Sequence, residues 1–287
     1  MQSCIFVLIN VLYKSEEKII EGDIMKDFGV IDAHAHIFPD KIADKAVGSI
    51  GNYYGVSMAC AGTCEDLIEH GKENNVVKYI VNSTATKVEQ VQPINSFIAD
   101  ACKKYDCFIG LGTIHPDVED VEAEVDRIIG LGLKGIKLHP DFQNFNIDDE
   151  AVMKIYGAAE GKLPILIHMG DENRTSSRPK RLAKVLDMFK GLVVIAAHFG
   201  GYSMWDESID CLVGRDVYFD TSSSLAFLDG TKVKNIIRRH GAQWVLFGSD
   251  YPMWTHKEEL ERFNKLGLDD HEKEMILYSN ACKLFNI

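Results

Sequence analysis

The chain has 287 residues, of which 46% are hydrophobic and 26% charged, and its formal net charge is −12. This apolar content excludes an intrinsically disordered chain, and the acidic excess, with no stretch rich in Lys and Arg, argues against a nucleic-acid partner. A chain of this length buries a core without disulfides, and it accommodates either two domains or one α/β barrel of about 250 residues.

The N-terminal segment differs from the rest of the chain. Residues 4–13 are apolar, but a membrane span needs about twice that length, and the features of a secretory signal are missing. Met25 is a more natural start for the domain. We therefore expect residues 1–24 to be an extension, with packing onto the domain as the alternative, and residues 25–287 to be a single cytoplasmic catalytic domain with no membrane partner.

The cysteines are irregularly spaced. Cys60 and Cys64 form a CxxxC pair and Cys102 and Cys107 a Cx4C pair, but neither is matched by a second such pair. A zinc ribbon or a redox motif is therefore disfavoured, and reduced, mostly buried cysteines are expected.

Short apolar segments recur at intervals of about thirty residues, with helix-patterned stretches between them. Repetition of strand and helix eight times predicts an α/β protein with a (β/α)8 TIM-barrel fold. An open doubly wound sheet is the alternative, but no glycine-rich phosphate loop occurs at a strand–helix junction. The predicted strands are residues 30–36, 76–84, 107–115, 135–140, 164–170, 193–200, 217–223 and 244–250.

The first interval is longer than the others by about fifteen residues. The surplus lies at about 37–64 and is rich in Gly, Ala and Tyr. Long loops at the C-terminal face of such barrels carry binding or covering functions, so we expect a lid-like insertion here.

Side chains that can bind metal end four of the predicted strands. They are His34 and His36 on the first strand, His168 on the fifth, His198 on the sixth and Asp250 on the eighth. The C-terminal ends of barrel strands are where catalytic groups assemble, and alternation places His34 and His36 on one face. One such histidine is usually structural, but five residues at corresponding strand ends predict a metal site.

The motifs VIDAHAHIFP, GIKLHPDFQ, LIHMG, AAHFGG and LFGSDYPMW occur in this order. Together they resemble the amidohydrolase superfamily, and more narrowly its amidohydrolase-related branch, which includes aminocarboxymuconate-semialdehyde decarboxylase. The resemblance runs from about Val30 to Ile287. It implies one divalent metal ion, most often Zn²⁺ with Mn²⁺ or Fe²⁺ as alternatives, and a homodimer. The implied ligands are His34, His36, His168 and Asp250.

Two of these residues are predicted to be catalytic. A divalent ion lowers the pKa of a bound water towards ~7, and Asp250 then accepts its proton as general base. The resemblance assigns His198 to hydrogen bonding with that water or to polarising the substrate, and a role as ligand of a second metal is the alternative.

The fourth strand bears on the number of metals. Lys137 and His139 share one face, with His139 at the strand end. We expect a single metal with His139 contacting substrate. A carbamylated Lys137 bridging two metals and a purely structural His139 are the alternatives.

Other candidates for substrate binding lie on the loops that follow the strands. They are His115, Arg174, Arg178 and Trp254, for which capping, surface exposure and packing are the competing explanations. Asp32 shares a face with His34 and is expected to orient a ligand imidazole.

We therefore predict a metal-dependent hydrolase that uses a metal-activated water on an ester, a lactone or an amide-type small molecule. The alternative is a non-oxidative decarboxylase or hydratase of an unsaturated or aromatic carboxylic acid. Both reactions use the same ligands, but binding of a carboxylate favours Arg174 or Arg178 in the pocket. A non-catalytic metal-binding barrel is disfavoured, because His198 and Asp250 are both present.

Overall fold

The computed structural model of the protein describes residues 28–287, so the predicted extension at residues 1–24 lies outside the described residues. Nine parallel strands form two sheets, β1 to β3 and β4 to β9, each in sequence order. They are β1 (Val30–His36), β2 (Val76–Asn82), β3 (Phe108–Gly110), β4 (Gly112–Thr113), β5 (Ile136–Leu138), β6 (Ile165–Ile167), β7 (Val194–Ala196), β8 (Tyr218–Asp220) and β9 (Val245–Leu246).

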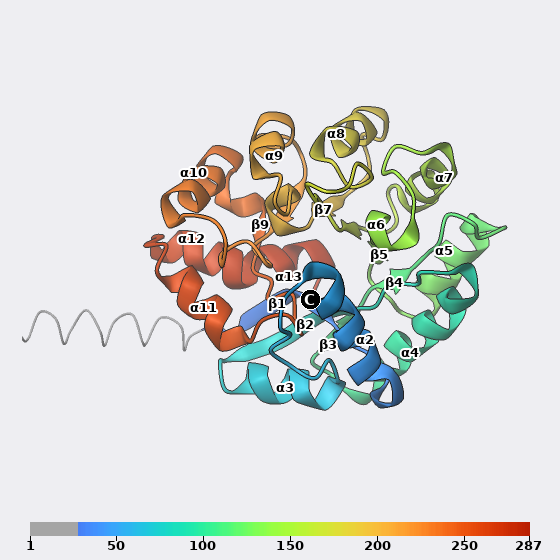
Figure 1. The fold of residues 1–287 in the computed structure, drawn as a ribbon, viewed down its shortest axis with the longest axis horizontal. Helices are drawn as coiled ribbons and strands as arrows, with labels where there is room; N and C mark the ends of the chain where they lie inside the picture. Colours follow the sequence, from blue (N-terminus) through green and yellow to red (C-terminus); the bar gives the residue numbers. More distant parts are fainter. Residues whose placement is uncertain (1–27) are drawn as a thin grey trace, which may run out of the picture.

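Backbone hydrogen bonds close these two sheets into one ring. β3 and β4 are two pieces of one predicted strand, and the Leu111 amide between them donates to the Val81 carbonyl at 2.9 Å. On the other side, the Ala33 amide of β1 donates to the carbonyl of Phe247, just after β9, at 2.8 Å. Eight strand positions around one axis, with the helices outside, confirm the predicted TIM barrel (Figure 1).

Helices follow the strands, and most of them cover the outside of the ring (Figure 1). Their boundaries carry the expected signals; for example, Thr255 and Glu258 form a capping box at the start of α11. The helices are α2 (Asp40–Tyr54), α3 (Cys64–Lys72), α4 (Val91–Lys104), α5 (Val121–Gly130), α6 (Pro140–Gln143), α7 (Glu150–Ala159), α8 (Pro179–Met188), α9 (Trp205–Cys211), α10 (Gly230–His240), α11 (His256–Asn264), α12 (Asp270–Glu274) and α13 (Asn280–Phe285).

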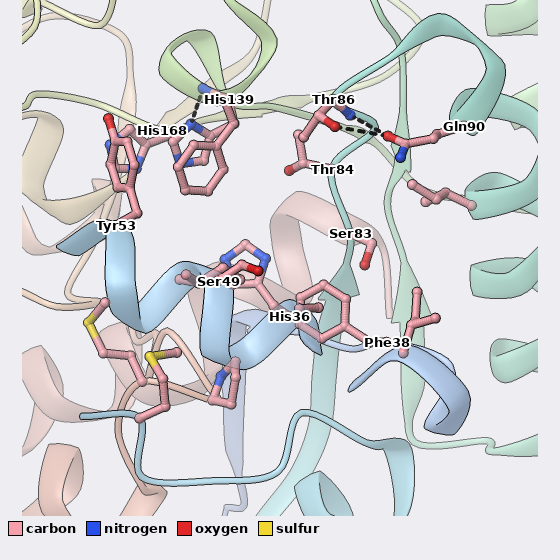
Figure 2. A pocket seen from close by; sticks show the side chains of 18 of the residues that line it. His36, Phe38, Ser49, Tyr53, Ser83, Thr84, Thr86, Gln90, His139 and His168 are labelled. Atoms are coloured by element: carbon pink, nitrogen blue, oxygen red, sulfur yellow. Dashed lines mark hydrogen bonds between the residues drawn. The ribbon is translucent and has the colours of Figure 1, made fainter. Parts of the chain in front are cut away.

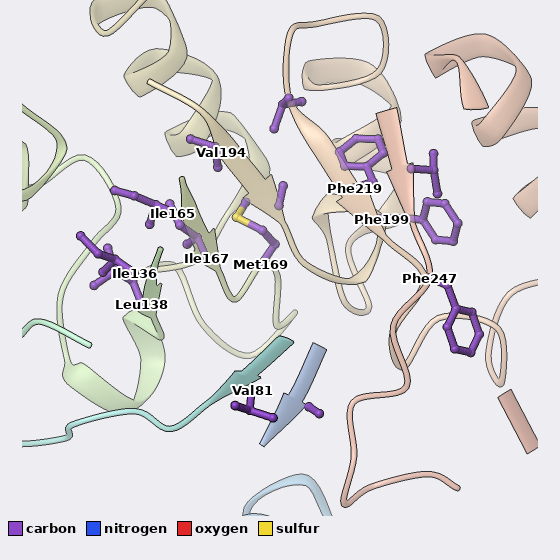
Figure 3. Packing of buried hydrophobic residues seen from close by; sticks show 14 of the residues in the cluster. Val81, Ile136, Leu138, Ile165, Ile167, Met169, Val194, Phe199, Phe219 and Phe247 are labelled. Carbon is purple, nitrogen blue, oxygen red and sulfur yellow. The ribbon is translucent and has the colours of Figure 1, made fainter. Parts of the chain in front are cut away.

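The core has two layers because side chains of successive strand residues alternate. The outer layer lies between strands and helices and includes Ile136, Leu138 and Ile165 (Figure 3). The inner layer fills the barrel, and the C-terminal helix α13 packs against it through Ala281 and Phe285. This inner layer includes Ile31, Ala33, Ile80, Leu111, Leu166, Ile195 and Leu246.

The predicted insertion at about 37–64 begins with a helix, α2, that lies near the barrel axis in the view of Figure 1. Ala43, Val47 and Gly51 form its buried face. Gly55 ends the helix in the left-handed conformation, with φ of +66°, which glycine adopts without strain. Its role as a lid stays a prediction.

Among residues 28–287, the structure contains no helix long and apolar enough to span a membrane.

Candidate active site

The two histidines of β1 meet Asp250 at the end of the barrel. The Nε2 atoms of His34 and His36 lie 3.2 Å apart. Asp250 Oδ1 lies 3.3 Å from His36 Nε2 and 3.6 Å from His34 Nε2. Three potential metal ligands therefore converge at one point, and two of them, His34 and Asp250, are buried.

His168 and His198 form the other side of the site. His168 Nδ1 lies 3.1 Å from His198 Nε2, and the His198 ring stacks on that of His34 with centroids 5.3 Å apart. His198 therefore connects His168 to the group of His34, His36 and Asp250. The His139 ring in turn stacks on that of His168 at 4.0 Å.

The hydrogen bonds of these two imidazoles indicate where their protons are. His198 Nδ1 faces the Ser222 carbonyl at 2.9 Å and His168 Nε2 faces the Gly170 carbonyl at 3.1 Å. A carbonyl oxygen only accepts, so each of these nitrogens carries the proton in the neutral ring. His168 Nδ1 and His198 Nε2 then present lone pairs to each other, so neither ring donates a hydrogen bond across this contact.

Burial keeps these imidazoles neutral, as metal binding requires. It lowers the pKa of His36 to about 4, although the hydrogen bond with Asp250 opposes the shift. It also lowers the pKa of His198, and it holds the pKa of His168 well below its usual value. For Asp250, burial raises the pKa, but the nearby histidines outweigh it and keep the pKa well below its usual value. Neutral imidazoles and an ionised carboxylate together fit a divalent cation.

Lys137 reaches the same group from the barrel interior. It lies on β5 and its Nζ is 3.0 Å from His34 Nε2. Burial lowers its pKa to about 8, against the opposing effect of Asp250 and Asp220.

Asp220, the last residue of β8, and Ser222, just after that strand, support the histidines. Asp220 Oδ2 lies 2.9 Å from His34 Nδ1, and Asp220 Oδ1 accepts from the His198 amide at 2.8 Å. Ser222 Oγ lies 3.0 Å from His34 Nδ1. Sequence reasoning missed both residues, although Asp220 lies within the seventh predicted strand and ends β8, close to the position where other strands carry ligands.

Asp32, by contrast, does not face the site. Its carboxylate accepts from the Ser249 amide at 3.0 Å and lies 2.9 Å from His256 Nε2 on α11. The expectation that Asp32 shares a face with His34 is wrong, because a register shift between Asp32 and Ala35 interrupts the alternation. Asp220 makes the hydrogen bond to the His34 ring instead.

A cavity of about 600 Å³ opens beside this group (Figure 2). His36, His139, His168, His198 and Asp250 line its inner end. Helix α2 forms one wall, and polar side chains of the segment after β2 form another (Figure 2). The apolar lining includes Phe38, Ile42, Ile50, Met58, Phe97, Phe142 and Met253, and the polar lining includes Ser83, Thr84, Thr86 and Gln90.

Neither of the two predicted arginines lines this cavity. Arg178 Nε donates to Glu207 Oε2 at 3.0 Å, and Arg174 Nε donates to the Tyr53 hydroxyl at 3.2 Å. None of the cavity-lining residues within 28–287 is Lys or Arg. A carboxylate substrate would therefore meet no guanidinium on the described wall.

Of the remaining predicted substrate contacts, only His139 lines the cavity among the described residues. His139 Nε2 lies 3.2 Å from the Tyr54 hydroxyl of α2. His115 Nδ1 accepts from the Asp117 amide in its own turn, and Trp254 Nε1 donates to Ser223 Oγ. Substrate roles for these residues stay predictions, but hydrogen bonds to nearby residues are enough to account for the positions of the His115 and Trp254 side chains.

The amidohydrolase family matches residues 31–287, which is most of the chain. The chain belongs to this family. The family predicted from the motifs is thereby confirmed, as is the class of metal-dependent enzyme. No curated protein matches the amidohydrolase described here.

Several solved structures resemble this amidohydrolase in fold. An uncharacterised TIM-barrel protein from Bordetella bronchiseptica is 21% identical with a TM-score of 0.74, and the match covers 90% of this chain and 99% of that one. A probable 2-pyrone-4,6-dicarboxylic acid hydrolase from Acinetobacter baumannii is 18% identical with a TM-score of 0.68 and coverages of 91% and 100%. A 5-carboxyvanillate decarboxylase from Novosphingobium aromaticivorans, solved with bound manganese, is 17% identical with a TM-score of 0.69 and coverages of 91% and 97%.

Proposed function

We propose that this amidohydrolase is a metal-dependent hydrolase of a neutral, largely apolar small molecule, an ester, a lactone or an amide. The observation that carries the proposal is the cavity wall. Apolar and aromatic side chains dominate it, and its described residues include histidines and carboxylates but no Lys or Arg. A hydrolase needs no cation to hold a neutral substrate, whereas a decarboxylase must bind a carboxylate.

One divalent cation fits between His34, His36 and Asp250, whose ligand atoms lie within 4.8 Å of one another, and we propose that these residues hold it together with His168. Nitrogen and oxygen donors of this kind suit Zn²⁺, and the manganese of the Novosphingobium decarboxylase supports Mn²⁺ as the alternative. When bound there, the cation supplies Lewis acidity and lowers the pKa of a coordinated water.

The protein's own groups handle the proton. Ser223 Oγ donates to Asp250 Oδ2 at 2.6 Å, which fixes the carboxylate and leaves Oδ1 towards the histidines. Asp250, ionised at neutral pH, accepts the proton of the attacking water as general base. His198 keeps its Nδ1 proton on the Ser222 carbonyl, so its Nε2 is free to accept a hydrogen bond.

The Thr84 hydroxyl is a candidate hydrogen-bond partner for a polar group of the substrate that does not react. It lines the cavity beyond β2, and its hydroxyl is a buried polar atom without a hydrogen-bond partner among the described residues (Figure 2). An unpaired buried hydroxyl is costly, so we propose that a polar group of the substrate pairs with it.

Decarboxylation or hydration of an unsaturated or aromatic acid is the second candidate. The structural likeness to 5-carboxyvanillate decarboxylase supports it, and the same residues would carry it. The lack of Lys and Arg on the described cavity wall argues against it. A homodimer and a cytoplasmic location remain predictions.

The test is a panel of aromatic lactones, esters and amides, each paired with a free carboxylic acid of similar size. The metal-loaded protein is incubated with each compound, and released acid and released CO₂ are measured. We expect hydrolysis of neutral members and no release of CO₂. In Asp250→Asn, turnover should fall by a factor of about 10² or more, because the general base is lost. Release of CO₂ from the acids without hydrolysis of their partners would overturn the proposal.

A further inference from the structure

A second group of metal-binding side chains lies outside the active-site cavity. Cys60, on the loop after α2, and Asp66 and His70, on α3, each offer one ligand atom, and these atoms lie within 4.8 Å of one another. Asp66 and His70 are four residues apart, so they project from the same face of the helix one turn apart. None of the three lines the active-site cavity.

The Asp66 carboxylate is held in one orientation. Its Oδ2 accepts from the Tyr251 hydroxyl at 2.6 Å and from the Ala61 amide at 3.0 Å. Its Oδ1 faces His70 Nε2 at 3.7 Å, which is too long for a hydrogen bond. Carboxylates that bind metal are commonly fixed by such hydrogen bonds on the other oxygen.

The Cys60 thiol has a weak partner and negative surroundings. It makes one long hydrogen bond, 3.9 Å to the Trp254 carbonyl. Burial, with smaller contributions from Asp66 and Glu258, raises the pKa of this thiol to about 12. The same negative charges attract a cation, and a bound metal ion deprotonates a thiol outright.

We propose that Cys60, Asp66 and His70 form a second metal site, which binds Zn²⁺ and is separate from the active site. One thiolate, one imidazole and one carboxylate are the donors that Zn²⁺ prefers, and water completes the tetrahedron. Binding forms the sulfur–zinc bond and releases the thiol proton to solvent. The ion would join α3 to the loop that contains Cys60 and Met58, and Met58 lines the active-site cavity. Because Asp66 also accepts a hydrogen bond from Tyr251, the ion would be connected to the segment after Asp250 as well.

The proposal does not depend on the hydrolase function, because Co²⁺ reports on the thiolate directly. Cobalt bound to a thiolate gives a sulfur-to-cobalt charge-transfer absorption in the near ultraviolet, and no cysteine lines the cavity among residues 28–287. We expect the band in Co²⁺-loaded wild-type protein and in Asp250→Asn. Cys60→Ser should lose it. Cys64→Ser is the matched control, because Cys64 is also buried but lies outside the group, and it should keep the band.

Zinc content of the purified chain provides the second measurement. Wild type and Cys64→Ser should carry one equivalent of zinc more than Cys60→Ser. His70→Asn, a change at a partly exposed position, guards against misfolding and should lower zinc affinity at this site at least tenfold. Tyr251→Phe, which frees Asp66, should lower it by a factor of about 10 to 100. Absence of the cobalt band in wild type, or its equal loss in Cys64→Ser, would overturn the proposal.

Discussion

Asp220 acts at the scale of a single residue, by fixing which nitrogen of His34 is available. Its carboxylate holds the proton on His34 Nδ1, at 2.9 Å, and so leaves the lone pair of Nε2 available to a metal ion. Asp220→Asn presents an amide there and disturbs this tautomer. We expect metal affinity to fall by a factor of about 10 to 100, measured by competition with a chelator.

The matched control for this change is Asp216→Asn, an exposed acidic residue just before β8. It removes the same charge but contacts no candidate ligand in the described structure, so its metal affinity should equal that of wild type. Equal affinity in Asp220→Asn and wild type would show that Asp220 has no role in holding the metal ligands.

For single residues, the sequence predicted the candidate ligands at the strand ends, but it did not predict the residues that form hydrogen bonds to them. His34, His36, His198 and Asp250 meet because parallel strands end at the same face of a barrel. The prediction put Asp32 on the wrong face of β1, because the alternation of residues along a sequence does not reveal a register shift in the strand. The partners of Arg174 and Arg178 lie on distant segments, so only the folded chain shows that these side chains are already paired.

At the scale of elements, helix α11 contains a carboxyl group with an unusual titration. Burial raises the pKa of Glu259 to about 8, although Arg262 opposes the shift. An unfolded Glu ionises near ~4.3, so between ~4.3 and about 8 the native state holds a proton that the unfolded state has lost. Stability should therefore fall as the pH rises through this window.

Glu259→Gln removes this titration. On going from pH 5 to pH 8, wild type should lose roughly 1–3 kcal/mol more of its free energy of unfolding than the variant does. Urea denaturation at both pH values measures this difference. Glu261→Gln, an exposed position on the same helix, is the control and should follow the wild-type pH dependence. A parallel pH dependence of wild type and Glu259→Gln would show that Glu259 is ionised in the native state throughout.

Element boundaries show what the apolar pattern can and cannot predict. All eight predicted strand regions contain strands, but their lengths differ, and the third is divided around Leu111 into β3 and β4. The segment at 37–64 was recognised by its surplus length, yet its helix α2 was not predicted. Two glycines, Gly48 and Gly51, lie within α2, and glycine is a poor helix former, so the residue types of this segment favour a loop.

At the scale of the whole molecule, one end of the barrel contains the candidate active site, and the other contributes to stability. The candidate ligands gather at the C-terminal ends of the strands, where the cavity opens. Helix α13 packs against the inner layer of the barrel that also includes Ile31, near the start of β1. Changes at this helix should therefore alter stability and leave the chemistry of the folded protein intact.

Phe285→Ala tests this separation. Phe285 is 4% exposed and packs in the inner layer, so its truncation should cost about 3–5 kcal/mol in free energy of unfolding by urea. Metal stoichiometry and kcat of the folded variant, measured well below its unfolding temperature, should match wild type. Ile287→Ala, an apolar truncation at an exposed position two residues on, should cost less than about 0.5 kcal/mol. A loss of bound metal in folded Phe285→Ala would show instead that packing by α13 holds the ligands in place.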